Sequence, residues 1–139
     1  MTAAARTLKA SSTAAFDQRR DAEKVVLQLS IPPSVNEIWS SKKGGGLRLS
    51  DKYAAWLCQA GWQLTQQRPG RIFGRYTLTC WMPRGSGADL DNLTKAVSDL
   101  LQLHGVIRND REAEEIHLYW QDECEETIVE VQPFAGAVV

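Results

Sequence analysis

Residues 89–105 read DLDNLTKAVSDLLQLHG, and this stretch decides the fold class of the chain. Its apolar residues recur at positions i, i+3, i+4, i+7 and i+8, which is the spacing of a helix that buries one face. They are Leu93, Ala96, Val97, Leu100 and Leu101. Gly105 follows at the place where a glycine commonly ends a helix. The stretch therefore predicts an amphipathic helix, which needs a second layer of structure to cover its apolar face.

Alternating segments on both sides predict a sheet that supplies this second layer. Apolar and polar residues alternate with the period of a half-buried strand in four segments, 25–31, 76–82, 116–120 and 127–131. Ser50 is a favourable N-cap, and the helical pattern that follows it stops before Pro69. The order β-α-β-α-β-β predicts an α+β fold, a single domain with a small mixed β-sheet and helices on one face.

The chain has the size and composition of one ordinary domain. It has 139 residues, of which 43% are hydrophobic and 24% charged, and chains usually divide into domains only beyond roughly 250–300 residues. No apolar run approaches the ~18–20 residues that a membrane helix needs. The three cysteines are too widely spaced for a zinc knuckle or a CxxC pair. We therefore expect a cytoplasmic protein with reduced thiols, and we exclude the membrane, secreted and collagenous classes.

Two segments lack the pattern of a packed core. Residues 1–23 contain small residues and scattered charges without apolar periodicity, so we expect a flexible N-terminal extension before a folded domain at 24–139. Residues 32–50 include the run Gly44-Gly45-Gly46, whose backbone freedom predicts a loop that moves.

The charges are polarised along the chain. Residues 42–95 hold nine Lys or Arg side chains and three Asp or Glu, whereas residues 96–139 hold two and ten. A basic segment suits a partner rich in phosphate, because local charge steers association more than the net charge of −1 does. The sequence leaves open the alternative that these segments form two solvated faces of opposite sign.

Two carboxylates and an ammonium group meet at the start of the helix predicted within 89–105. Asp89 and Asp91 project to one side if the chain is extended there, and Lys95 lies one helical turn beyond Asp91. Close carboxylates repel, and a hard cation such as Mg²⁺ relieves that repulsion. The plainer alternative is that the aspartates cap the helix and that Asp91–Lys95 and Lys95–Asp99 are ordinary i,i+4 ion pairs. A third carboxylate, Asp110, reaches this place only if the chain turns back along the sheet.

Three motifs together resemble the RusA family of Holliday junction resolvases. They are the string DLDNLTK at 89–95, the acidic turn at Asp110 before a strand, and the segment PPSVN at 32–36. They lie in the family's order over about residues 25–132. The resemblance implies a small homodimeric, Mg²⁺-dependent endonuclease of phages and prophages, active in DNA recombination and repair, that nicks four-way DNA junctions symmetrically.

The resemblance also implies roles for individual residues. Asp89, Asp91 and Asp110 are the expected catalytic carboxylates and the expected ligands of Mg²⁺, or alternatively of Mn²⁺. Lys95 is the expected essential lysine. Asn109 departs from the pattern, because the family often has a second acid beside the third aspartate.

The loop before the first helix and the basic segment contain the residues that we expect to contact DNA. Trp39 lies near Lys42 and Lys43, where an exposed aromatic ring can stack on a base, although a ring folded over the core is an equal alternative. The full set of expected DNA-binding residues is Asn36, Trp39, Lys42, Lys43, Arg48 and Arg84. Two other functions stay open: a non-catalytic nucleic-acid-binding module, and a metal-dependent nuclease that acts on other branched DNA.

Overall fold

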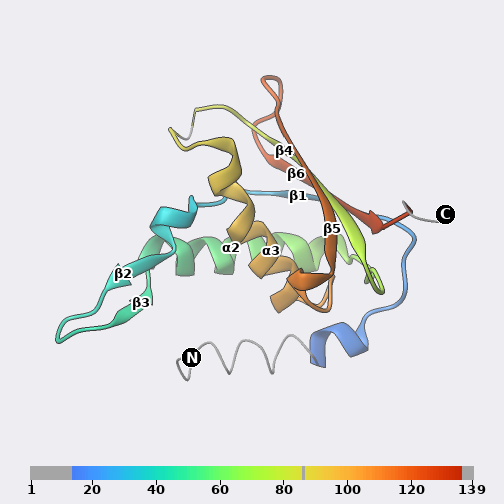
Figure 1. Cartoon of the computed structure of the whole chain (residues 1–139), viewed down its shortest axis with the longest axis horizontal. Helices are drawn as coiled ribbons and strands as arrows, with labels where there is room; N and C mark the ends of the chain where they lie inside the picture. The colour runs from blue at the N-terminus through green and yellow to red at the C-terminus, as the bar shows by residue number, and fades with distance from the viewer. Residues whose placement is uncertain (1–13, 86, 136–139) are drawn as a thin grey trace.

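A four-stranded mixed β-sheet forms one layer of the molecule. The computed structural model describes residues 14–85 and 87–135, and its strands lie in the order β1-β6-β4-β5 (Figure 1). They are β1 (Val25–Leu29), β4 (Tyr76–Met82), β5 (Ala113–Trp120) and β6 (Thr127–Pro133). β4 and β5 run parallel, whereas β6 is antiparallel to both β1 and β4. The predicted mixed sheet is confirmed. In the described parts of the chain, no helix is long and apolar enough to cross a membrane.

Two helices cover one face of this sheet (Figure 1). α2 (Asp51–Gln67) begins at the predicted cap, where the Ser50 hydroxyl accepts a hydrogen bond from the Tyr53 backbone N–H at 3.0 Å. α3 (Thr94–Leu103) buries the predicted apolar stripe and is preceded by the short 3₁₀ helix η2 (Leu90–Leu93). The predicted α+β fold with helices on one face is therefore confirmed.

The hydrophobic core lies between the helices and the inward side of the sheet. Leu27 and Leu29, which alternate along the edge strand β1, are fully buried, as is Leu78 of the inner strand β4. β5 is the other edge strand, and all of its residues are exposed or only partly buried. Two more 3₁₀ helices, η1 (Val35–Glu37) and η3 (Asp110–Glu112), lie in the segments that lead toward α2 and β5. The sheet and α3 thus carry the short 3₁₀ helices η1, η2 and η3, which lie at or beside the predicted site residues.

The segment 32–50, which we expected to be a mobile loop, contains a two-stranded hairpin. β2 (Trp39–Ser41) pairs antiparallel with β3 (Leu47–Leu49), and Lys42 N donates to Gly46 O at 2.9 Å across the turn. All three glycines of the turn have positive φ, between 84° and 107°, which other residues rarely adopt. They therefore build a turn, and strands of three residues are too short for alternation to reveal them. The hairpin projects from the body of the molecule (Figure 1).

The described part of the expected N-terminal extension packs against the domain. Residues 14–18 are helical, and the Phe16 side chain is only 3% exposed. The Arg71 guanidinium lies 4.7 Å from the centre of the Phe16 ring, and Arg19 Nε donates to the His104 carbonyl at 2.5 Å. This packing differs from the expected flexibility, because one aromatic anchor and two arginines leave no periodic signal in a sequence. Residues 1–13 lie outside the described residues.

Candidate active site

Asp89 and Asp91 lie on the short connection between β4 and α3. Asp89 precedes η2 with an extended backbone, φ −72° and ψ 148°, and Asp91 lies within η2. Both side chains are exposed, and among the described residues neither carboxylate forms a hydrogen bond or an ion pair. The capping alternative is therefore not supported for Asp89, and the Asp91–Lys95 pair is not formed. Two carboxylates are left available for a ligand.

Lys95, on the first turn of α3, contacts two other carboxylates. Its Nζ lies 2.8 Å from Asp99 Oδ1, one turn along the helix, and 3.6 Å from Asp110 Oδ2. Burial works to lower the pKa of Lys95, but the hydrogen bonds and charges of Asp99 and Asp110 outweigh it and raise the pKa above its usual value. The ammonium group therefore keeps its positive charge.

Asp110 reaches α3 because the chain turns back after the helix. Gly105, with a φ of 73°, follows the end of α3, and the Asp110 backbone N–H then donates to Gln102 Oε1 at 3.1 Å. Asn109 Oδ1 accepts a hydrogen bond from Arg111 N at 2.9 Å. The residue that stands in place of a second acid thus caps η3. The return of the chain, which spacing alone left open, is observed.

A polar pocket joins η1 to the turn before η2. It has a volume of about 240 Å³, and its lining residues are Ser34, Asn36, Glu37, Gly87, Ala88, Asp89 and Asn92. The PPSVN segment and the DLDN turn lie far apart in the sequence but meet at this pocket. Asn36 and Asp89, which we predicted as a DNA contact and a metal ligand, therefore belong to one site.

The donor chemistry of the aspartates fits a hard divalent cation. Mg²⁺ prefers oxygen ligands and usually combines one or two carboxylates with substrate phosphates, and Asp89 and Asp91 are exposed carboxylates at one short turn. Within residues 14–85 and 87–135, no group of three or more His, Cys, Asp or Glu side chains is gathered closely enough to hold an ion. The common metal site of Asp89, Asp91 and Asp110 thus stays a prediction, with Lys95 lying beside Asp110.

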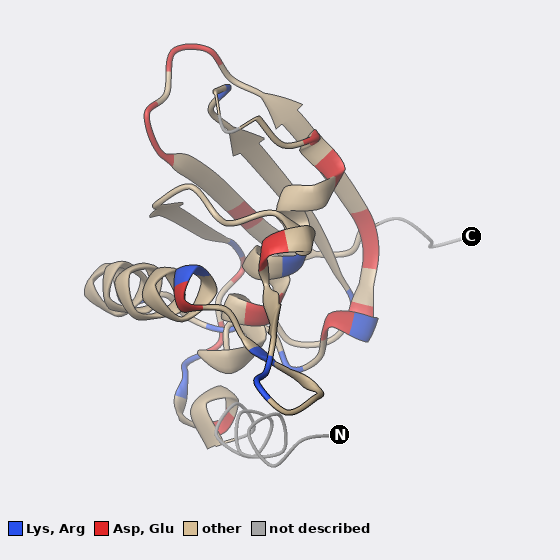
Figure 2. Ribbon diagram, turned by 90° about the vertical axis from the view of Figure 1, so that its left-hand side faces the viewer, with Lys and Arg blue, Asp and Glu red and all other residues tan. Residues whose placement is uncertain are grey.

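The hairpin brings together four of the predicted DNA contacts. Trp39, which is 46% exposed, lies in β2, Lys42 and Lys43 lie in the turn, and Arg48 lies in β3. Arg84 lies elsewhere, because its Nε is 2.6 Å from an Asp122 carboxylate oxygen in the acidic turn between β5 and β6. Figure 2 shows this acidic turn at one end of the molecule, far from the hairpin. The basic hairpin and the acidic turn therefore lie in different parts of the molecule, although Arg84 lies beside the acidic turn.

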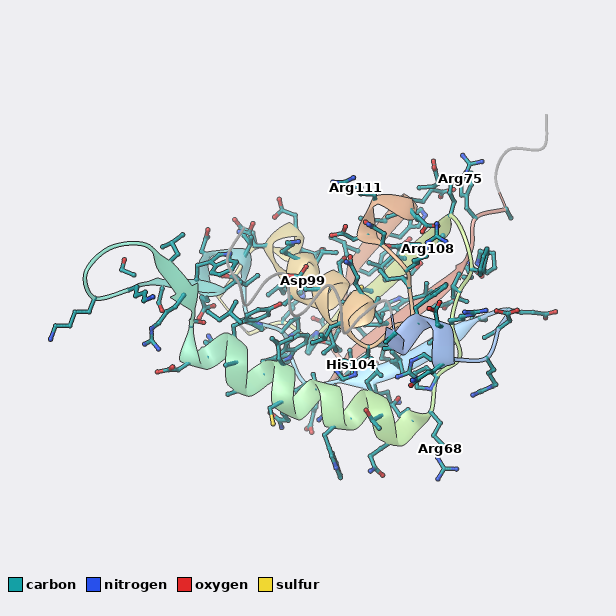
Figure 3. All side chains as sticks on the ribbon, turned by 90° about the horizontal axis from the view of Figure 1, so that it is seen from below. Arg68, Arg75, Asp99, His104, Arg108 and Arg111 are labelled. Atoms are coloured by element: carbon teal, nitrogen blue, oxygen red, sulfur yellow. The ribbon has the colours of Figure 1, made fainter. Side chains whose placement is uncertain are left out.

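Two further residues belong to this site. The Tyr53 hydroxyl, on α2, donates to Asp99 Oδ2 at 3.1 Å, and Asp99 lies on α3 (Figure 3). The sequence shows the i,i+4 spacing of Lys95 and Asp99. It cannot show the Tyr53–Asp99 contact, because that contact joins two helices. Arg108 and Arg111 flank Asp110 as exposed basic residues, and they were not predicted as DNA contacts.

The residues of this site lie within the part of the chain that is similar to known proteins. The family model described as "Endodeoxyribonuclease RusA" matches residues 30–132, which include η1, the DLDN turn and Asp110. A curated protein of Aquifex aeolicus (strain VF5), named "Crossover junction endodeoxyribonuclease RusA", is 28% identical to this chain over 118 residues. The aligned region covers 81% of this chain and 94% of that protein. Both the pocket and α3 lie inside the residues that the family model matches.

Proposed function

Because this chain belongs to the endodeoxyribonuclease RusA family, we propose that it resolves four-way DNA junctions by metal-dependent hydrolysis of phosphodiester bonds. The observation that carries the proposal is the arrangement of the charged side chains on the β4–α3 connection and at the start of α3. Asp89 and Asp91 are exposed carboxylates without partners among the described residues. Lys95, which follows them on the first turn of α3, lies 3.6 Å from Asp110. The name of the Aquifex aeolicus relative supports a crossover junction as the substrate.

We propose Mg²⁺, or Mn²⁺ in its place, as the cofactor. Asp89, Asp91 and Asp110 are the residues that hold it, since carboxylate oxygens are the ligands that hard divalent cations prefer. When bound, the ion polarises a phosphoryl oxygen and lowers the pKa of a water molecule toward neutrality. The exposure of Asp89 and Asp91 leaves room for a DNA phosphate to complete the site.

Lys95 and Asn36 supply the polar groups around the scissile phosphate. Negative charge grows on the phosphate oxygens during hydrolysis, and a fixed cation stabilises that charge. The Lys95 side chain is 50% exposed and positively charged, so it is accessible to a phosphate. The Asn36 amide lies in the same pocket as Asp89 and is suited to donate a hydrogen bond to the DNA backbone.

The hairpin provides the main DNA-binding surface in this proposal. Lys42, Lys43 and Arg48 neutralise phosphates, and the exposed ring of Trp39 stacks on a base where the junction leaves one unpaired. Arg48 and Arg84 are weaker contacts than the two lysines, because Asp51 lies 3.4 Å from Arg48 and Asp122 lies 2.6 Å from Arg84. Arg111 extends the basic surface beside Asp110, and Arg108 adds to it more weakly, because it lies 3.5 Å from Glu112.

We also propose a homodimer as the active form. A four-way junction has approximate two-fold symmetry, and a C2 dimer places two equivalent sites on opposite strands. One nick in each of these two strands then separates the junction into two duplexes. The proposed setting is the cytoplasm of a bacterial host, where phage or prophage DNA recombines.

Cleavage of a labelled synthetic junction tests the proposal. The substrates are a four-way junction, a flap and a linear duplex of the same sequences, each with Mg²⁺ or with EDTA. We expect paired nicks in the four-way junction with Mg²⁺ and none with EDTA. Binding without cleavage would favour the non-catalytic module. Equal cleavage of flap and junction would favour a nuclease for branched DNA in general.

A further inference from the structure

Asp99 uses both of its carboxylate oxygens on neighbouring side chains. Its Oδ1 lies 2.8 Å from Lys95 Nζ, and its Oδ2 accepts a hydrogen bond from the Tyr53 hydroxyl at 3.1 Å. These partners come from different helices, α3 and α2, and the Asp99 side chain between them is 30% exposed. An ordinary i,i+4 pair on a helix surface has no such second partner. Asp99 therefore does more than add one ion pair to α3.

Tyr53 is a rigid donor for this carboxylate. It is 3% exposed, and its ring stacks on Trp56 with the ring centres 6.4 Å apart. Its backbone N–H is bound to the Ser50 hydroxyl that caps α2. Burial, followed by the nearby charge of Asp99, raises the pKa of Tyr53, so the hydroxyl stays protonated and continues to donate. One oxygen of Asp99 is thus fixed to the core, which leaves the other for Lys95.

A lysine needs such a partner to keep its ammonium group in one place. The side chain is a flexible four-carbon stem whose charged end is otherwise free to sample solvent. Lys95 Nζ lies closer to Asp99, at 2.8 Å, than to Asp110, at 3.6 Å. The contact with Asp99 therefore holds the Lys95 ammonium group, and it holds this group beside the Asp110 carboxylate.

We propose that Asp99 is a positioning residue that holds the Lys95 ammonium at the reaction centre, and that Tyr53 orients Asp99. This inference rests on the proposed function, in which Lys95 and Asp110 act on the scissile phosphate. Asp99 itself does not touch the DNA in this account. Its effect on cleavage passes through Lys95 alone.

Single-turnover cleavage of a labelled four-way junction at saturating enzyme tests the proposal. Rates are divided by the folded fraction, which is measured by thermal unfolding, and junction affinity is measured separately in EDTA. Asp99→Ala should slow cleavage about tenfold or more, because a misplaced catalytic group loses up to about a hundredfold in rate. Junction affinity should stay within about twofold, because Asp99 makes no DNA contact. Tyr53→Phe, which keeps the buried ring, should cause a smaller loss of the same kind.

A double-mutant comparison separates positioning from a general structural effect. In a Lys95→Ala enzyme, the added Asp99→Ala change should cause no further loss, since both changes remove one shared effect. Equal slowing by Asp99→Ala with and without Lys95 would overturn the positioning role, as would a parental rate for Asp99→Ala. A parental rate for Lys95→Ala would contradict the proposed function itself. Glu130→Ala is the matched control, because it breaks an ion pair with Lys24 at 3.1 Å on the sheet and should leave the rate unchanged.

Discussion

Replacement of Lys42 and Lys43 by alanine should weaken junction binding and reduce its dependence on salt. Both side chains lie in the turn of the hairpin and are exposed, and among the described residues neither has an ion-pair partner. Both charges are therefore free to meet phosphates. Each phosphate contact contributes about 0.9 to the slope of log affinity against log salt. Loss of two contacts should lower the slope by about 1.8. A rise from about 50 to 200 mM salt should therefore weaken binding by a factor that is roughly tenfold smaller for the variant than for the parent.

Fluorescence anisotropy of a labelled junction in EDTA measures this slope directly. The double variant should still cut at the parental rate when the enzyme is saturating, because the hairpin binds DNA and does no chemistry. Lys24→Ala is the control, since Lys24 lies beside β1 and is paired with Glu130 at 3.1 Å. An unchanged slope for the double variant would refute the assignment of the hairpin to DNA. An equal fall in slope for Lys24→Ala would refute it as well.

Three further predictions concern packing and the cysteines. Phe16→Ala should lower the free energy of unfolding by about 3 kcal/mol in denaturant titrations, and a change within about 0.5 kcal/mol would show that the segment adds no core contacts. Gly105→Ala should destabilise more than Gly74→Ala in the same assay. Their φ angles are similar, 73° and 78°, but a Cβ at Gly105 collides with the backbone of the N-terminal segment, whereas one at Gly74 meets nothing within 4 Å; equal losses would contradict this packing. Burial raises the pKa of the Cys80 thiol to about 12, so almost no reactive thiolate exists at about pH 8. A thiol reagent followed by mass spectrometry should find the exposed Cys58 modified and Cys80 intact in the folded protein, and early modification of Cys80 would contradict its burial.

Elements with a long local pattern were predictable from the sequence. The strand Tyr76–Met82 has the predicted bounds, and α2 begins at the predicted cap, Ser50. Both depend on interactions between residues close in the sequence: alternation along a strand and a hydroxyl that binds a backbone N–H three residues later. The apolar stripe of α3 is confirmed for the same reason.

Features that depend on contacts between distant segments were not predictable. Phe16 packs where α3 ends, and Tyr53 of α2 holds Asp99 of α3. Neither contact has a local spacing that a sequence can display. The sequence showed Asp99 only as the i,i+4 partner of Lys95. The Tyr53 hydroxyl that orients Asp99 comes from another helix, so no local spacing indicates it. The family resemblance gave Asn36 and Asp89 separate expected roles, and only the structure brings both into one pocket.

The cleavage rate of Asp91→Asn tests most directly the central claim that these aspartates serve hydrolysis of junction DNA. The amide keeps the size of the side chain, and the exposed carboxylate has no partner among the described residues. Folding should therefore change by less than about 1 kcal/mol. Removal of one charged ligand from the proposed Mg²⁺ site should raise the barrier by about 4 kcal/mol, which slows the reaction roughly a thousandfold. The account predicts a folded variant that binds the four-way junction at least as well as the parent and cuts it about a thousandfold more slowly in Mg²⁺. A folded Asp91→Asn protein that nicks the junction at the parental rate would contradict it.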